Sequence, residues 1–231
     1  MNASAETKNM KKVLLYSTSL IVVSMFLLCT ACFKQVVFAE DNSETIHGKF
    51  VNNSVCTATL TYSNFNTSPN YKTNVKASVN CKNQKYEIVP PIISGYSPQI
   101  KAFNFLDDNL EQIVIILPTG GSGGYTNFFV YSYSPKTNNF ELIFRTDEYA
   151  PKITAEVKNN VATISHEPFK PLSINNANIL SSNVEVMPVN YVLPVYNAGL
   201  NKYLLATTFK IVSSYQANQI GNAVIVLELG E

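Results

Sequence analysis

A serine flanked by glycines is the first feature of this 231-residue sequence that could do chemistry. Ser122 lies in GGSGG at 120–124, which satisfies the G-x-S-x-G pattern of serine hydrolases. Asp147 and His166 follow in the chain order Ser, Asp, His that α/β-hydrolases use. In such an enzyme the histidine takes the proton of the serine and the carboxylate orients the histidine. Together these three residues would make an acyl-transfer site.

The segments around Ser122 predict a different role for it. A nucleophile elbow requires a strand, a sharp turn and then a helix, whereas YTNFFVYSY at 125–133 predicts a strand. The helices that separate the strands of an α/β-hydrolase are also missing from the pattern. We therefore predict a turn between two strands, no catalytic residue and no enzymatic activity. A hydrolase acting on a cell-wall or carbohydrate substrate is the alternative.

The N-terminus has the pattern of a secretory signal. Several lysines precede the apolar run Val13–Phe33, and Val37 and Ala39 at the −3 and −1 positions predict cleavage after Ala39. Two alternatives are lipidation at Cys32, because CTAC resembles a lipobox, and an uncleaved membrane anchor, because ~20 apolar residues span a bilayer. All three place the rest of the chain outside the cell or at the outer face of the cytoplasmic membrane.

The charge balance restricts the partners. Removing residues 1–39 takes away four of the 17 basic and one of the 16 acidic residues, which leaves 13 and 15 and a net charge near −2. Nucleic acids and anionic membrane surfaces require clustered Lys and Arg. We therefore expect no nucleic acid, membrane contact only through an N-terminal anchor or lipid, and a cell-envelope glycan or protein as the kind of partner.

The two cysteines of the mature chain predict a bridged hairpin. The segments 54–62 and 75–81 alternate between apolar and polar residues, and a turn-rich segment separates them. A hairpin folded between Ser68 and Pro69 places Cys56 directly opposite Cys81, within reach of a disulfide. An exported protein favours the disulfide, and two buried thiols are the alternative.

The remaining pattern predicts an all-β protein of antiparallel sheets with an N-terminal signal or hydrophobic helix. Further strands are expected at 85–89, 100–105, 112–117, 126–134, 140–145, 153–158, 161–165, 184–187, 201–213 and 223–229. The expected organisation is a signal at 1–39, a flexible start at 40–48, a first β domain at 49–167 and a second β repeat at 168–231.

The strand after the glycine turn is rich in aromatic residues. Phe129, Tyr131 and Tyr133 share one face, and Phe128 and Val130 share the other. This pattern predicts one core face and one partly exposed aromatic face, which could line a carbohydrate or peptide site. Packing in the core is nevertheless the favoured account of these aromatic residues.

The segment FNFLDDNLEQIVIILPTGGSGGYTNFFVYSYSPKTNNFELIF at 103–144 resembles the degenerate FG-GAP or VCBS-like repeats of secreted Gram-positive proteins. The segment 202–229 looks like a second copy. The resemblance implies propeller-like or sandwich-like repeats and, in intact copies, calcium in an acidic loop. Asp107 and Glu111 match two acids of that loop, but Phe103 and Phe105 occupy the two earlier ligand positions.

A calcium ion needs six to eight oxygen ligands, so we expect no metal or cofactor, with Asp107 and Glu111 as the remaining metal candidates. The sequence therefore predicts a non-catalytic binding or envelope-associated module. A calcium-stabilised structural domain is a further alternative.

Overall fold

The computed structural model describes residues 43–52, 54–106, 109–121, 124–149, 152–159, 161–166, 171–175, 184–213 and 219–230. All of the secondary-structure elements in these ranges are β-strands. None of the described elements is a helix that could cross a membrane. The chain divides into two compact units, 1–40 and 41–231. The predicted cleavage position at Ala39, the lipidation candidate Cys32 and the hydrophobic N-terminal helix lie outside the described residues.

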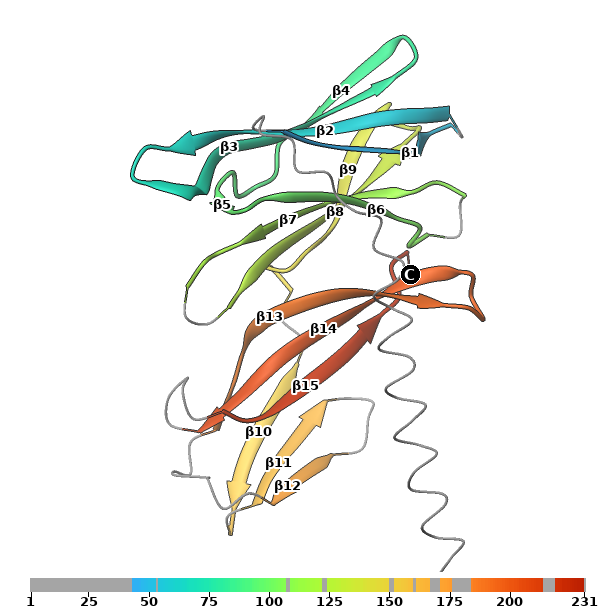
Figure 1. Cartoon of the computed structure of the whole chain (residues 1–231). Coiled ribbons are helices and arrows are strands. Elements are labelled where there is room, and N and C mark those ends of the chain that lie inside the picture. The colour runs from blue at the N-terminus through green and yellow to red at the C-terminus, as the bar shows by residue number, and fades with distance from the viewer. Residues whose placement is uncertain are drawn as a thin grey trace, which may run out of the picture. The chain divides into compact units, whose positions relative to one another are not determined.

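The described residues form antiparallel sheets, as predicted (Figure 1). The N-terminal sheet contains β1 (Ser43–Val51), β2 (Ser54–Phe65), β3 (Ser68–Cys81), β4 (Gln84–Ile88) and β5 (Gly95–Tyr96). The central sheet contains β6 (Gln99–Phe103), β7 (Gln112–Pro118), β8 (Thr126–Ser134) and β9 (Asn139–Arg145). The small sheet contains β10 (Ile153–Lys158), β11 (Val161–His166) and β12 (Leu172–Asn175). The C-terminal sheet contains β13 (Val184–Asn197), β14 (Lys202–Ser213) and β15 (Gln219–Leu227).

The predicted hairpin and its disulfide are confirmed. Ala58 pairs with Val79 in β2 and β3, which is the register that the alternation of apolar residues requires. Cys56 and Cys81 form a disulfide with their Cα atoms 4.4 Å apart. A disulfide is consistent with an extracellular location, because such bonds persist in oxidising compartments.

The tip of this hairpin differs from the prediction. The register shifts between Thr61 and Ser63 and again, by more, between Asn64 and Phe65. Phe65 therefore pairs with Ser68, and the chain reverses two residues earlier than expected. Asn74 has a positive φ of 53° at the position of the first shift. An extra residue of this kind is a β-bulge, which the alternation of apolar residues did not reveal.

The predicted flexible start at 40–48 is wrong for the described part of that range, because Ser43–Val51 forms β1 and pairs with β2. Ile46 and Phe50 point inward, but Gly48 and Glu44 occupy the other inward positions and hide the alternation. A Cβ on Gly48 would lie 2.5 Å from the Phe50 ring and 2.6 Å from Oε2 of Glu111, so a larger residue would displace these side chains.

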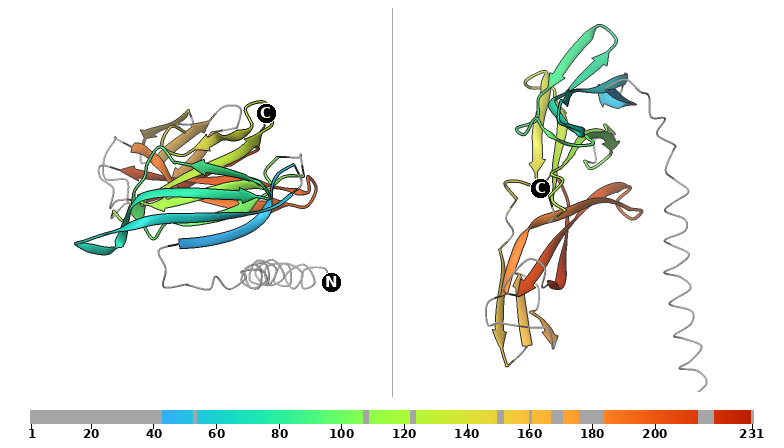
Figure 2. Two further views of the ribbon diagram at one scale, coloured as in Figure 1. Left: turned by 90° about the horizontal axis from the view of Figure 1, so that it is seen from above. Right: turned by 60° about the vertical axis from the view of Figure 1, so that its left-hand side comes forward.

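The central sheet is covered on both faces (Figure 2). Phe129 and Tyr131 of β8 belong to a core shared with the N-terminal sheet. Phe128 and Val130 belong to a second core shared with the C-terminal sheet, which contributes Phe209. All five side chains are at most 5% exposed. The favoured interpretation, in which these aromatic residues pack in the core, is therefore confirmed. The partly exposed aromatic face is wrong, because the N-terminal sheet buries it.

The predicted boundary between residues 167 and 168 divides one sheet. β12 lies after this boundary and pairs with β11, which lies before it. The small sheet in turn shares a core with the C-terminal sheet through Ile164 and Ile211.

Candidate functional site

The glycine-rich segment connects β7 to β8, two adjacent antiparallel strands. The backbone N–H of Thr119 donates to the Tyr125 carbonyl at 2.9 Å, and the N–H of Gly124 donates to Gly121 at 3.0 Å. Gly120 has a φ of 72°, and a Cβ there would lie 2.1 Å from the ring of Tyr96. Ser122 lies outside the described residues. The turn leads into a strand, so the local structure lacks the helix of a nucleophile elbow.

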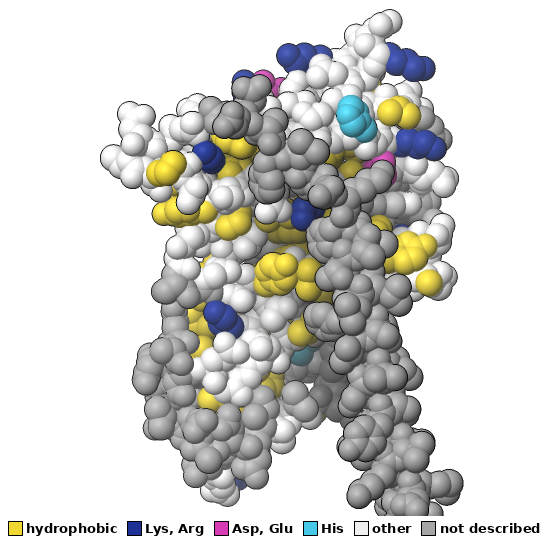
Figure 3. Space-filling model, viewed as in Figure 1, with side chains coloured by type: hydrophobic (Ala, Val, Ile, Leu, Met, Phe, Trp, Pro, Cys, Tyr) yellow, Lys and Arg dark blue, Asp and Glu magenta, His cyan; other side chains and the backbone are white. Residues whose placement is uncertain are grey.

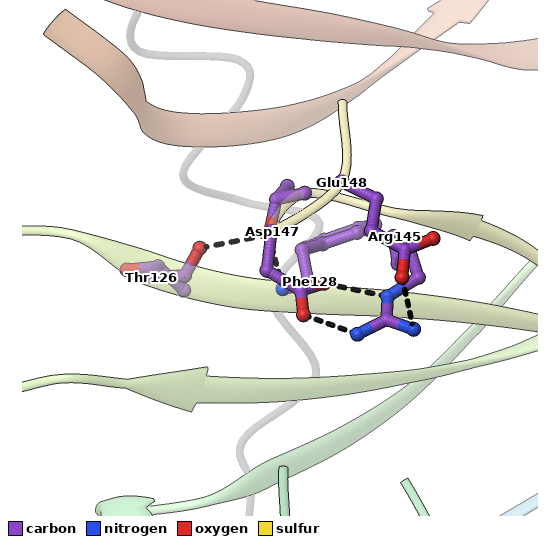
Figure 4. Close-up of polar contacts among 6 residues, drawn as sticks. Thr126, Phe128, Arg145, Asp147 and Glu148 are labelled. Atoms are coloured by element: carbon purple, nitrogen blue, oxygen red, sulfur yellow. Dashed lines mark hydrogen bonds and ion pairs between the residues drawn. The ribbon is translucent and has the colours of Figure 1, made fainter. Parts of the chain in front are cut away.

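The other two hydrolase candidates are held by other partners. Both carboxylate oxygens of Asp147 accept hydrogen bonds from the Arg145 guanidinium, one of them from Nε at 2.8 Å (Figure 4). These bonds hold the pKa of Asp147 below its usual range. Nδ1 of His166 lies 3.1 Å from the carbonyl oxygen of Lys152. In a triad the carboxylate would occupy this position beside Nδ1.

The metal candidate Glu111 connects two sheets. Its Oε2 accepts a hydrogen bond from the backbone N–H of Lys49 in β1 at 2.8 Å. Its own N–H donates to the Lys49 carbonyl at 2.9 Å. Asp107 lies outside the described residues. Within the described ranges, no three His, Cys, Asp or Glu side chains come together as a metal site would require.

A charged cluster closes the end of β9. Arg145 also forms an ion pair with Glu148 at 2.8 Å, so two carboxylates surround one guanidinium. Between them, the hydroxyl of the buried Thr146 accepts from the N–H of Phe128 at 2.9 Å and donates to the Thr126 carbonyl at 3.2 Å (Figure 4). These contacts continue the ladder past its last regular pair, which is a structural role.

A shallow hollow of about 210 Å³ lies beside this cluster, between the central and C-terminal sheets. Its lining is Tyr125, Thr126, Asn127, Thr146, Asp147, Pro188 and Val189. The hollow is smaller than the ~300–1,000 Å³ of typical ligand sites. Its one charged side chain is already paired, so the hollow offers little chemistry to a ligand.

The buried Tyr131 stands near this cluster. Its hydroxyl has no hydrogen-bond partner among the described residues. Burial raises the pKa of Tyr131 to about 12, so the ring stays neutral and protonated. The side chain is 5% exposed and belongs to the core, so it is not placed to meet a ligand.

The most unusual surface is one face of the C-terminal sheet. In the middle of this sheet, every second residue of β13 from Tyr191 to Val195, and of β15 from Val224 to Val226, points away from the core and is apolar. The exposed fractions are 48% for Tyr191, 46% for Leu193, 47% for Val195, 59% for Val224 and 57% for Val226. We call these residues, with Leu204, Ala206 and Thr208 of β14 between them, the outer face.

The strand register places the outer face in rows across the sheet. One row joins Leu193, Ala206 and Val226. Hydrophobic side chains gather near the middle of the view in Figure 3, where β13 and β14 run in Figure 1. The opposite face packs on the central sheet through Val192 and Leu205. An antiparallel sheet with one face in water normally alternates apolar and polar residues, and this sheet is apolar on both faces.

The sequence pattern predicted no role for the outer face. Within the range of β13, a strand was expected only at 184–187, because Pro188 and Pro194 are unusual inside a strand. A signal was nonetheless present, since NAVIVL at 222–227 is apolar at successive positions after Asn222. Continuous apolar runs indicate strands that are buried, or able to be buried, on both faces.

Comparison with known proteins gives no function. No family model matches the chain, and no solved structure matches it. The chain is similar to the uncharacterized protein YybI of Bacillus subtilis (strain 168), with 24% identity over 156 residues. The match covers 58% of this chain and 58% of that protein, so the chain spans less than two thirds of the length of the curated relative it matches.

Proposed function

We propose that the protein is a secreted or cell-surface binding module without catalytic activity, and that the outer face binds a partner protein. The observation that carries the proposal is the presence of large apolar side chains on both faces of the C-terminal sheet. Contiguous exposed apolar patches mark interaction sites on soluble proteins. Burying the five half-exposed side chains would contribute roughly 4–7 kcal/mol before the costs of association.

The composition of the outer face favours a protein over a glycan as the partner. Tyr191 is the one aromatic residue among its eight side chains, and none of the eight is charged. Sites for small polar ligands combine aromatic rings with several polar groups that fix the orientation of the ligand. An aliphatic surface instead matches the apolar centre of a protein interface.

The proposed location outside the cytoplasm draws on two independent features. The disulfide between Cys56 and Cys81 fits an oxidising compartment. The sequence before Ala39 fits a secretory signal, with lipidation at Cys32 or an uncleaved anchor as alternatives.

We also infer that the architecture is sandwich-like and not propeller-like, because neighbouring sheets share cores between their faces. The resemblance to FG-GAP or VCBS-like repeats remains a prediction. The hydrolase and calcium-stabilised alternatives draw no support from the described contacts, in which Asp147, His166 and Glu111 each have a structural partner.

Site-specific photo-cross-linking tests this function. A benzoylphenylalanine at Leu193 of the full-length chain is expected to form a discrete adduct with a partner protein in intact cells. The matched control is the same probe at Lys85, an exposed residue of β4 on a different sheet. A second probe at Val195 is expected to lose the adduct when Leu193→Lys is added. Identical adducts from Leu193 and Lys85 would refute the proposal.

A further inference from the structure

The edge strands of the sheets differ in how they are protected against pairing. An exposed edge presents free backbone N–H and C=O groups, and natural proteins block it with charges, prolines, bulges or a short strand. Most of the described edge strands carry a charged residue: Glu44 in β1, Lys85 in β4, Lys101 in β6, Glu141 in β9, Glu156 in β10 and Glu185 in β13. The uncharged edge strands β5 and β12 have two and four residues.

β15 is neither charged nor short. It is nine residues long, and its sequence QIGNAVIVL contains no charged residue and no proline. It pairs with β14, and no other described strand pairs with its second edge. Its register is regular from Gly221 to Leu227, and the one irregularity lies at its start.

The opposite edge of the same sheet provides a direct comparison. β13 contains Pro188 and Pro194, and its register to β14 shifts around Val189. Prolines and bulges both interrupt pairing at an edge. In the described part of the chain, the β13 edge of the C-terminal sheet is therefore interrupted by prolines and a bulge, whereas the β15 edge has no proline and is regular from Gly221 to Leu227.

We propose that β15 pairs in antiparallel fashion with β15 of a second copy of this chain, centred on Ile225. The pairing joins two three-stranded sheets into one sheet of six strands. Val224 then lies opposite Val226 of the second copy, and Ala223 lies opposite Leu227. This inference rests on the proposed function, because the two outer faces become one continuous binding surface.

The sequence of β15 is what points to a second copy as the occupant. Residues at equal distances before and after Ile225 are of the same kind. Val224 and Val226 are both exposed valines, and Ala223 and Leu227 are both apolar residues of the other face. Directly opposed residues of an antiparallel pair lie on the same side of the sheet, so all four valines stay on the outer face. The next pair is Asn222 with Glu228, so no like charges meet. A two-fold pairing of this kind closes on itself.

The expected dimer is weak in free solution. A strand of nine residues at ~3.4 Å per residue, in a sheet ~10 Å thick, offers roughly 300 Å² along its edge. Stable interfaces bury ~800 Å² on each partner. A test that traps the pairing covalently is therefore preferable to one that depends on affinity alone.

Cysteine cross-linking tests the register. Chains carrying Val224→Cys and Val226→Cys, with different tags, are co-expressed at full length and oxidised mildly in intact cells. Opposed Cα atoms lie ~4.5–5.5 Å apart, which a disulfide can bridge. We expect a disulfide-linked dimer that contains both tags. A matched pair of chains with Leu193→Cys and Val195→Cys, on β13 of the same face, is expected to give at least tenfold less. Equal yields from the two pairs, or no dimer from the first pair, would overturn the proposal.

A charge exchange at the same positions separates edge pairing from association through the outer face. Val224→Lys with Val226→Lys places lysines opposite lysines, whereas Val224→Lys with Val226→Glu places each lysine opposite a glutamate. Both positions are more than half exposed, and the melting temperature of each variant verifies that it folds. Chemical cross-linking of the purified full-length chains is expected to give at least tenfold more dimer for the lysine–glutamate variant. Equal loss in both variants would show that the edge does not pair.

This outcome is independent of the photo-cross-linking experiment. If the cysteine pair gives no disulfide-linked dimer but the adduct at Leu193 is retained, the proposed dimer is refuted and the proposed binding function stands. If the adduct is absent but the disulfide-linked dimer forms, the proposed partner protein is refuted and self-association through β15 stands.

Discussion

Replacing Gly120 by alanine is expected to destabilise the turn between β7 and β8. The residue has a φ of 72°, and an added Cβ would lie 2.1 Å from Cδ2 and 2.2 Å from Cε2 of Tyr96. The ring of Tyr96 cannot move away freely, because it contacts Tyr71 with ring centroids 5.0 Å apart. The added methyl group therefore meets both backbone strain and a steric clash.

The magnitude is the sum of these two effects. A left-handed conformation costs a residue with a Cβ about 1–2 kcal/mol. Overpacking against a neighbour costs about 1–3 kcal/mol more. We expect the free energy of unfolding to fall by about 3 kcal/mol, which lowers the melting temperature of a chain of this size by about 6–12 °C.

Two neighbouring glycines make the measurement specific. Gly124 also has a positive φ, 66°, but the nearest atom to its Cβ position is 3.8 Å away, so Gly124→Ala should lose only the strain component of about 1–2 kcal/mol. Gly121 has no atom within 4 Å of its Cβ position and no positive φ, so Gly121→Ala should be neutral or slightly stabilising. Thermal unfolding by circular dichroism measures all three.

A double variant isolates the contact with the ring. In a Tyr96→Ala background the clash is gone, so Gly120→Ala should cost no more than Gly124→Ala costs in the wild type. Equal destabilisation by Gly120→Ala and Gly121→Ala would refute the reasoning, and so would an undiminished cost of Gly120→Ala in the Tyr96→Ala background.

Three further predictions concern the contacts of the N-terminal sheet. Replacing both Cys56 and Cys81 by alanine should lower the free energy of unfolding by about 3 kcal/mol, because the disulfide joins residues 25 apart, and a stability of the double variant equal to that of the wild type would contradict this. Glu111→Ala should cost about 1 kcal/mol through loss of the acceptor for a β1 backbone N–H, whereas Glu87→Ala, which removes an exposed ion pair, should change stability by less than about 0.5 kcal/mol in denaturant titrations; added calcium should shift neither melting temperature. Burial raises the pKa of Glu44 above its ordinary value of 4.5, so the folded state binds the proton more tightly than the unfolded state; the contribution of Glu44 to stability is present below pH 4.5 and is lost as the pH rises through the raised pKa, and Glu44→Gln should flatten this part of the pH dependence of the melting temperature.

Local pattern was sufficient to predict the hairpin with Cys56 and Cys81. From Cys56 to Leu60 and from Ala77 to Cys81 the residues alternate strictly and one face is apolar, so one register satisfies this part of both strands. β1 was missed because Gly48 and Glu44 fill inward positions where apolar residues would be expected. Their role depends on Glu111 and on the backbone of Ile100, which lie far away in sequence.

The outer face was missed for a related reason. A sequence shows which residues of a strand share a face, but the sheet that will cover that face is fixed only by tertiary packing. Other sheets cover the aromatic residues on both faces of β8. On the C-terminal sheet, the face that carries Leu193 and Val226 remains exposed. The local pattern does not distinguish these two outcomes, because β8, β13 and β15 all carry apolar residues on both faces.

The two-sided burial of the central sheet has a consequence for how the protein is made. The N-terminal sheet precedes it in the chain, so one face can be covered as soon as β9 has been synthesised. The other face, with Phe128 and Val130, has to wait until Phe209 of β14 has been added. During synthesis the unfinished chain therefore presents an apolar surface, which is where chaperones bind and where aggregation begins. A chain that stops before β14 would keep that surface permanently, so the last strands serve as the closing step of biogenesis.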